Sequence, residues 1–212
     1  MNKILFIDTV TTGMNPEKCA IYRVGGIYTI DGVEQKRFEL RMRPFINARI
    51  SEQSLWISGE SRSSLLVYPD EKDVFARFVE ILNDIVDIKN PKDKIYLAGF
   101  NSTAFDVPFL REWFRRNGNE RFRDYFYVQT IDTMCLATVM LIKTRHNMPD
   151  FHLETAARFM HVKAVATQSY DCLTNAKTSL EIYRAFEKRC GLGECLDNTE
   201  ATEVITNYSE KK

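Results

Sequence analysis

Residues 6–13 read FIDTVTTG and form the most informative stretch of the chain. Residues Lys3–Thr9 form a short apolar run, which is followed by a polar loop that contains Gly13 and Pro16. This pattern predicts a buried strand that ends in a turn. Asp8 then lies at the end of this strand, where its carboxylate would reach the edge of a sheet. An Asp at such a position caps a loop as often as it binds a ligand, so Asp8 alone does not identify a function.

Residues 98–110, AGFNSTAFDVPFL, show a second transition from strand to helix. Asp106 falls in the first turn of a predicted helix over Phe105–Arg116, where the helix dipole favours a carboxylate. Two interpretations are open at this point. Asp106 is either an ordinary acidic residue at a helix start or a second metal ligand that faces Asp8.

The first third of the chain predicts consecutive antiparallel strands. Cys19–Ile30 and Glu34–Met42 are strand candidates, and Asp31-Gly32 between them is a strong hairpin turn because both residue types tolerate positive φ. Together with Lys3–Thr9 they form an antiparallel set that opens the fold.

Helices and strands alternate after residue 50. Spacing and capping residues predict helices over Ser51–Trp56, from Pro69-Asp70 onward, and over Phe105–Arg116, Thr133–Leu141, Leu153–Met160 and Leu173–Glu187, with strands over Ile95–Phe100 and Tyr127–Ile131. This order is typical of an α/β or α+β domain with a mixed sheet flanked by helices. We expect one domain over residues 1–190 and a mobile C-terminal tail over residues 191–212, where the hydrophobic periodicity fades.

Composition excludes several classes of protein. With 212 residues, 44% of them hydrophobic and 12% aromatic, the chain can bury a real core and is not intrinsically disordered. Its 29 basic residues balance 29 acidic ones, so it is not a globally cationic nucleic-acid coat. The apolar run Ile4–Ile7 is too short for a signal core or a membrane span, and the 5 cysteines are scattered without a C-x-x-C pair. We therefore expect a cytoplasmic protein with reduced thiols and no membrane contact.

The two Asp-containing segments together resemble the epsilon-subunit-like 3′–5′ exonucleases, a branch of the DEDD superfamily with a ribonuclease H-like fold. FIDTVTTG matches the first motif of that family, F-x-D-x-E-T-T-G, except at one position, and residues 101–110 match the second motif, N-x-x-x-F-D-x-x-F-L, in full. Gly59 and Thr130–Thr133 also look like the connecting segments of the family. The likeness spans roughly residues 3 to 187.

The resemblance implies a fold, a reaction and a set of residues. It predicts an α/β, ribonuclease H-like fold and a cleft in which Asp8 and Asp106 are metal ligands and catalytic residues. It also places Thr11, Thr12, Gly13, Asn101 and Phe105 among the substrate-binding positions. Members of the family hold two divalent ions with four carboxylates and use a His-x-x-x-x-Asp segment near the C-terminus for the general base and the fourth ligand.

Three of these chemical positions depart from the family pattern. Val10 replaces the Glu of the first motif, and the segment that aligns with the third motif has Tyr170 in place of His and Asn175 in place of Asp. Valine cannot bind a cation, asparagine offers only a neutral carbonyl, and tyrosine, with an ordinary pKa near 10, is a poor base at neutral pH. We expect catalysis to be lost or very weak, with at most one weakly held Mg²⁺ or Mn²⁺.

Nearby acidic residues do not offer an obvious replacement. Asp171 is adjacent to the required position but would point off a helix start, Glu181 lies on a different face of that helix, and Asp132 belongs to a segment that the family uses structurally. The segment His146–His152 looks like a metal cluster only superficially, because Pro149 breaks its register; we interpret it as a loop before a helix.

Basic and aromatic residues follow the second motif. Arg111 and Arg115 share a helical face and either track a phosphate backbone or form a solvated face paired with Glu112 and its neighbours. Among the aromatic residues of this region, Trp113 is the one left open as a stacking or partner surface.

Three hypotheses follow. The first is an exonuclease-like protein without catalysis that binds single-stranded nucleic acid or a nucleotide in the cleft. The second is an active, metal-dependent 3′–5′ exonuclease that releases nucleoside monophosphates. The third is a module that keeps the fold only to bind a protein partner.

Overall fold

The computed structural model describes residues 1–162 and 171–192 of the chain. Its strands are β1 (Lys3–Thr11), β2 (Ile21–Ile30), β3 (Val33–Arg41), β4 (Tyr96–Gly99) and β5 (Ile131–Asp132). Its helices are α1 (Glu52–Ser58), α2 (Arg62–Leu66), α3 (Glu71–Asn83), α4 (Asp106–Arg116), α5 (Phe122–Tyr125), α6 (Thr133–Leu141), α7 (Leu153–Phe159) and α8 (Cys172–Cys190), with a short 3₁₀ turn η1 (Arg145–Asn147).

The strands form one mixed sheet in the order β3-β2-β1-β4-β5. β1, β2 and β3 pair antiparallel, whereas β4 pairs parallel to β1 and β5 parallel to β4. This arrangement confirms the predicted mixed sheet with three antiparallel strands at its start. Asp31 (φ 47°) and Gly32 (φ 79°) form the predicted hairpin turn in left-handed conformations.

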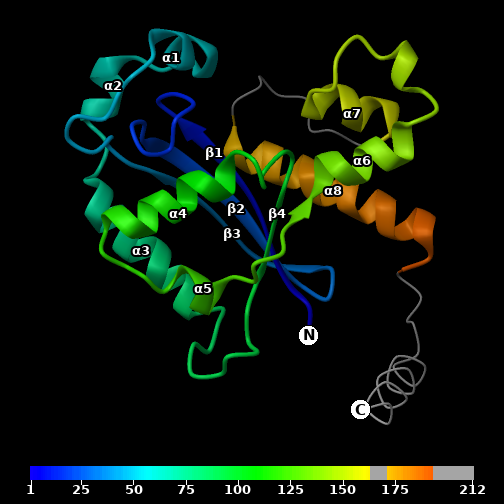
Figure 1. The fold of residues 1–212 in the computed structure, drawn as a ribbon, viewed down its shortest axis with the longest axis horizontal. Coiled ribbons are helices and arrows are strands. Elements are labelled where there is room, and N and C mark those ends of the chain that lie inside the picture. Colours follow the sequence, from blue (N-terminus) through cyan, green and yellow to red (C-terminus); the bar gives the residue numbers. More distant parts are fainter. Residues whose placement is uncertain (163–170, 193–212) are drawn as a thin grey trace, which may run out of the picture.

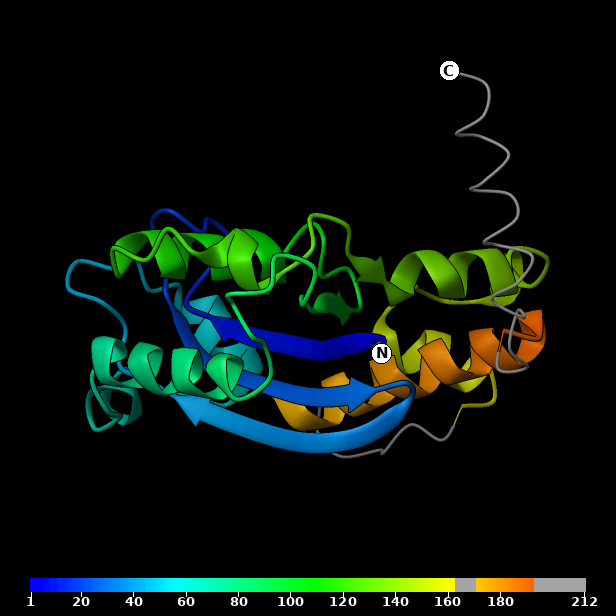
Figure 2. The ribbon, with the colours of Figure 1, turned by 90° about the horizontal axis from the view of Figure 1, so that it is seen from below.

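Helices cover both faces of the sheet (Figures 1 and 2). α3, α4 and α5 gather on one side, and α6, α7 and α8 on the other. Because successive strand residues point to opposite faces, Leu5 and Ile7 of β1 join the core under α3 and α4, while Ile4 and Phe6 join the core under α8.

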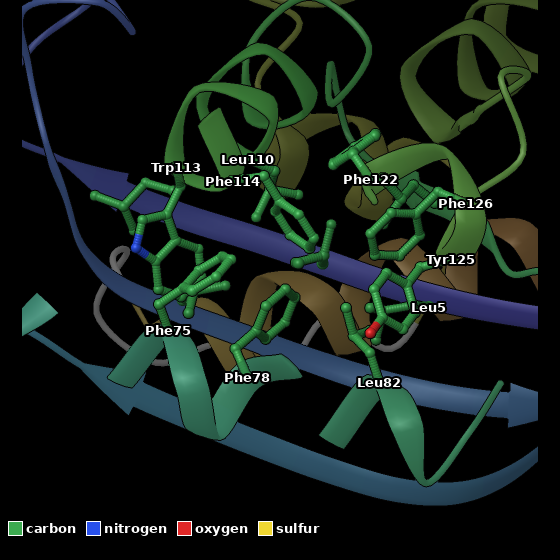
Figure 3. Close-up of a cluster of buried hydrophobic side chains, with 14 of the residues drawn as sticks. Leu5, Phe75, Phe78, Leu82, Leu110, Trp113, Phe114, Phe122, Tyr125 and Phe126 are labelled. Carbon is green, nitrogen blue, oxygen red and sulfur yellow. The ribbon is translucent and has the colours of Figure 1, made fainter. Parts of the chain in front are cut away.

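The larger core is rich in aromatic side chains. In Figure 3 the side chains of α3 and α4 point toward one another and toward Leu5 of β1. Trp113 is completely buried there, with its ring 5.2 Å from those of Phe75 and Phe78. The prediction that left Trp113 open as a stacking or partner surface is therefore wrong: it faces the sheet together with Leu110 and Phe114 of α4.

Short elements account for the other differences from the predicted pattern. α2 and α5 have five and four residues and were not predicted, because one helical turn carries no readable periodicity. The predicted strand Tyr127–Ile131 is also wrong in its bounds, since β5 contains only Ile131 and Asp132. β1 extends two residues beyond the predicted Thr9 and ends at Thr11.

None of the helices in the described part of the chain is both long enough and apolar enough to cross a membrane.

Candidate active site

Asp8 lies on the face of β1 that is covered by α8. Its partner across the antiparallel pair is Gly25 of β2. A Cβ atom at Gly25 would lie 2.6 Å from the Cβ atom of Cys172 and 2.8 Å from the backbone nitrogen of Leu173, so only glycine allows the start of α8 to approach the sheet this closely. The close approach brings the first turns of α8 beside Asp8.

Two side chains of α8 interact with the carboxylate of Asp8. The Asn175 amide donates a hydrogen bond from Nδ2 to Oδ2 of Asp8 at 3.3 Å, and the Cys172 thiol is a further hydrogen-bond partner. Burial and the charge of Asp106 raise the pKa of Asp8 well above its ordinary value, whereas these two donors act in the opposite direction. The structure thus brings Asp8 and Asn175 together, at the position where the motif alignment places a ligand pair.

Asp106 is the first residue of α4 and is buried. Its Oδ1 atom accepts hydrogen bonds from the backbone N–H of Thr9 at 2.8 Å and from the Thr9 hydroxyl at 2.6 Å. Burial nevertheless raises the pKa of Asp106 to about 7, because desolvation outweighs these hydrogen bonds and Asp132 adds a nearby negative charge. Asp8 and Asp106 are close enough for their charges to interact.

Thr9 is a positioning residue that motif reading missed. Asp8 and Thr9 are consecutive on β1 and therefore point to opposite faces of the sheet. Asp8 faces α8, while Thr9 faces α4 and holds Asp106. The sequence did contain a sign of this role, because Thr9 places a hydroxyl group in an otherwise apolar strand, directly after the Asp of the first motif.

Val10 lies in an apolar environment. It is half-buried and packs against a small cluster formed by Tyr22, Leu55 and Leu65. Its partner across the strand pair is Arg23, whose guanidinium forms an ion pair with Glu60 at 2.7 Å. The position at which the family carries a metal-binding Glu is thus bordered by hydrocarbon and by an arginine.

The loop after β1 is held together by its own side chains. Thr11 donates from Oγ1 to the carbonyl of Gly13 at 2.7 Å, and Thr12 donates from Oγ1 to the carbonyl of Arg49 at 2.6 Å. Thr11, Thr12 and Gly13 are all buried. A substrate contact at these three positions stays a prediction, and the hydroxyl protons are already engaged within the protein.

The loop between β4 and α4 presents Asn101 at the surface. Asn101 is exposed and has a left-handed backbone (φ 60°), and its N–H donates to the Asp132 carboxylate at 2.9 Å. Asp132 also accepts from the N–H groups of Thr103 and Met134, so it fastens this loop to the start of α6. Phe105 is half-buried and its ring lies 5.1 Å from that of Phe109.

The other acidic residues considered as replacements are used elsewhere. Asp171 caps α8, accepting from the Leu173 N–H at 3.2 Å and from the Thr174 hydroxyl at 2.5 Å. Glu181 pairs with Lys177 and Arg184, at 2.9 Å each. Tyr170 lies outside the described residues.

The arginines of α4 and the following turn are mostly paired locally. Arg115 pairs with Glu112 at 2.6 Å and Arg121 with Asp124 at 3.1 Å. Arg111 and Arg115 do line a pocket of about 510 Å³, but Glu17 and Glu112 line it as well. The charges in this pocket are therefore balanced. Of the two interpretations of Arg111 and Arg115, this favours a solvated face with local ion pairs over a surface that binds a phosphate backbone.

The residues at the site do not fit two divalent ions. Within residues 1–162 and 171–192, no three His, Cys, Asp or Glu side chains gather closely enough to hold a metal. The oxygen donors that remain are the carboxylates of Asp8 and Asp106 and the amide oxygen of Asn175. Oxygen donors of this kind are those that hard divalent cations prefer.

The chain belongs to an exonuclease family. The family model described as exonuclease (RNase T) matches residues 5–183, and the fold is that of the ribonuclease H-like 3′–5′ exonucleases of the DEDD superfamily. The resemblance inferred from the two motifs is thereby confirmed. No curated protein matches the chain in sequence.

Solved exonuclease I structures share this fold. The zinc-bound complex of E. coli exonuclease I with single-stranded DNA has a TM-score of 0.71 and 16% identity, over 89% of this chain and 41% of that one. The complex of the same enzyme with a dA16 oligonucleotide has a TM-score of 0.72 and 15% identity, over 91% and 42%. Exonuclease I from Methylocaldum szegediense has a TM-score of 0.68 and 16% identity, over 89% and 41%. The chain therefore spans about two fifths of the length of these proteins.

Proposed function

We propose that this protein is an exonuclease-like protein with impaired catalysis, which binds single-stranded nucleic acid or a nucleotide at the Asp8–Asp106 site with at most one Mg²⁺ or Mn²⁺. The observation that carries the proposal is the hydrogen bond from Asn175 to Asp8, at 3.3 Å. At the position where the family has a fourth carboxylate, this chain presents a neutral amide whose N–H₂ group already occupies an oxygen of Asp8.

The environment of Val10 supports the loss of the second metal ion. Two-metal catalysis uses ions about 3.5–4 Å apart to stabilise the attacking and leaving oxygens. A carboxylate about 4 Å from a dication contributes roughly 8 kcal/mol of gross Coulomb energy at an effective dielectric near 20. Desolvation offsets most of that energy, yet the absence of two carboxylates still removes several kcal/mol. Val10, packed with Tyr22 and Leu55, has no atom that could replace one of them.

Retention of Asp8 and Asp106 supports binding of a single cation. Burial is the main cause of their raised pKa values, and the charge of Asp106 adds to it at Asp8, so negative charge is unfavourable at this site. A divalent cation held by these carboxylates would compensate their negative charge and would attract a phosphate group of a bound strand. We therefore expect nucleic-acid binding to require Mg²⁺ or Mn²⁺ and to weaken with added salt.

The same retained pair favours an alternative function, an active 3′–5′ exonuclease that works with an incomplete site. Thr9 still holds Asp106 in a defined position, as a ligand would require. This candidate predicts metal-dependent release of nucleoside monophosphates.

One experiment separates the two functions. The full chain is incubated with a 5′-labelled single strand in Mg²⁺, in Mn²⁺ and in EDTA, beside Asp8→Ala and the triple variant Val10→Glu/Tyr170→His/Asn175→Asp. Our proposal predicts metal-dependent binding without shortening of the strand by the natural chain, and shortening by the triple variant. Shortening by the natural chain that disappears in Asp8→Ala would instead establish an active nuclease. A natural chain that neither binds nor shortens the strand in any buffer, and that binds no nucleoside monophosphate, would reject both functions and leave the protein-binding module.

A further inference from the structure

The two tryptophans of the chain lie in opposite environments. Trp113 is completely buried in the aromatic core, whereas Trp56 is 82% exposed. Trp56 is on α1, directly after Leu55, which is the buried anchor of that helix. A tryptophan exposed to this extent leaves a large apolar ring in water, which is a feature of surfaces that contact a ligand.

α1 is built onto the segment that follows Asp8. The N–H of its cap, Ser51, donates to the carbonyl of Thr12 at 2.8 Å, and Leu55 packs in the cluster that borders Val10. Figure 1 shows α1 beyond the end of β1. At a rise of 1.5 Å per residue, Trp56 lies only about 7.5 Å along the helix axis from Ser51, the residue that is attached to Thr12.

The surroundings of Trp56 fit a single aromatic ligand better than a partner helix. The residues one turn earlier on α1, Glu52 and Gln53, are both polar and exposed, so Trp56 is not part of a continuous apolar stripe. Glu52 is also paired with Arg62 at 2.5 Å, which leaves little net charge beside the ring. Ile57, the next residue, is only 36% exposed, so Trp56 supplies most of the apolar surface of α1. A flat aromatic ring with little net charge beside it suits the face of a nucleobase, which every base offers irrespective of sequence.

We propose that Trp56 is a base-stacking residue, which contacts an unpaired base of the strand whose phosphate lies toward Asp8 and Asp106. This inference rests on the proposed function, because it places the nucleic acid at the same site. The stacking of Trp56 would be a contact that depends neither on the base sequence nor on a metal ion. The contact is made by α1, which would border the site on one side.

The fluorescence of the two tryptophans gives a direct test. Because Trp113 is enclosed in the core, a bound strand should quench only the emission of Trp56. The full chain in Mg²⁺ is titrated with an oligothymidylate and with an abasic strand of the same length, which has the phosphates but no bases. We expect quenching by the oligothymidylate only.

Affinity is measured separately, from the anisotropy of a dye-labelled oligothymidylate. Base–aromatic stacking of about 1–3 kcal/mol corresponds to a 5- to 150-fold loss of affinity in Trp56→Ser, and Trp56→Phe should stay within a few-fold of the natural chain. Val67→Ser, which removes an exposed apolar residue (81% exposed) at the C-cap of α2, is the matched control and should bind normally.

The outcomes distinguish this inference from the function on which it rests. A strand that binds the natural chain and Trp56→Ser equally well, without quenching, would overturn the role of Trp56 and leave the proposed function intact. A natural chain that binds no strand at all would overturn both.

Discussion

Replacing Asn175 by Asp should make the stability of the fold depend on divalent metal ions. In the natural chain the Asn175 amide donates to Asp8 at 3.3 Å. The substitution removes that donor and puts a second carboxylate against the first, in a site where Asp106 already disfavours negative charge. The protein without metal should therefore be less stable, and a bound cation should restore it.

The magnitude follows from the distance. Two unit charges 3.3–4 Å apart repel by about 4–5 kcal/mol at an effective dielectric near 20. Proton uptake by the carboxyl pair and rotation of the new side chain relieve part of this repulsion, so we expect a net loss of about 2 kcal/mol. For a chain of this size that loss lowers the Tm by about 4–8 °C. A cation present at about 100 times its Kd would return about 2.7 kcal/mol.

Thermal unfolding in EDTA and in Mg²⁺, at pH 8, measures both effects. Asn147→Asp is the matched control, because it makes the same chemical change at an exposed residue outside the site. Its Tm should match that of the natural chain in both buffers. If Asn175→Asp were as stable as the natural chain in EDTA, or gained nothing from Mg²⁺, then the amide of Asn175 does not act as a neutral partner of Asp8.

Three further predictions concern the surroundings of the site. Gly25→Ala should cost about 3 kcal/mol in urea unfolding, because the added Cβ meets the backbone of α8 at 2.8 Å, and an unchanged midpoint would contradict that contact. Asp106→Asn should flatten the pH dependence of stability measured in EDTA. Its pKa of about 7 in the folded protein lies above the unfolded value, so folded Asp106 retains its proton longer and the natural chain loses stability as the pH rises from about 4 to 7; an identical profile in the variant would argue against a buried, protonated Asp106. Val10→Glu alone should lose about 1–3 kcal/mol in EDTA by placing a carboxylate beside Tyr22 and Leu55, and calorimetry showing equal stability would mean that this side chain faces water.

Sequence reasoning succeeded where a physical pattern extended over many residues. The apolar run of β1 and the hairpin at Asp31-Gly32 were readable, and so was the helical spacing of α3. α2 and α5 were not, because a single turn is specified by tertiary contacts such as those of Leu65 rather than by its own periodicity.

The candidate site was only partly readable for a related reason. The family resemblance placed Asn175 at the position of a metal ligand, and the structure brings it to Asp8, 167 positions away in the sequence. The resemblance could not show that Thr9 holds Asp106, since this depends on which face of β1 turns toward α4. Nor could it decide between core and surface for Trp113, because a tryptophan on an amphipathic helix is compatible with either until the packing is known.

The central position of β1 has a consequence for how the site can move. β1 pairs with β2 over its whole length and with β4 over Ile4–Phe6, and it lies between helices on both faces of the sheet. Its amide protons should thus be among the slowest in the molecule to exchange with solvent, released only when the whole domain opens. Asp8 and Thr9 are anchored to this least deformable element. Any adjustment that admits a ligand should then come from α1 and the start of α8, which pack against the strand. One side of the site would stay in place while the other side moves.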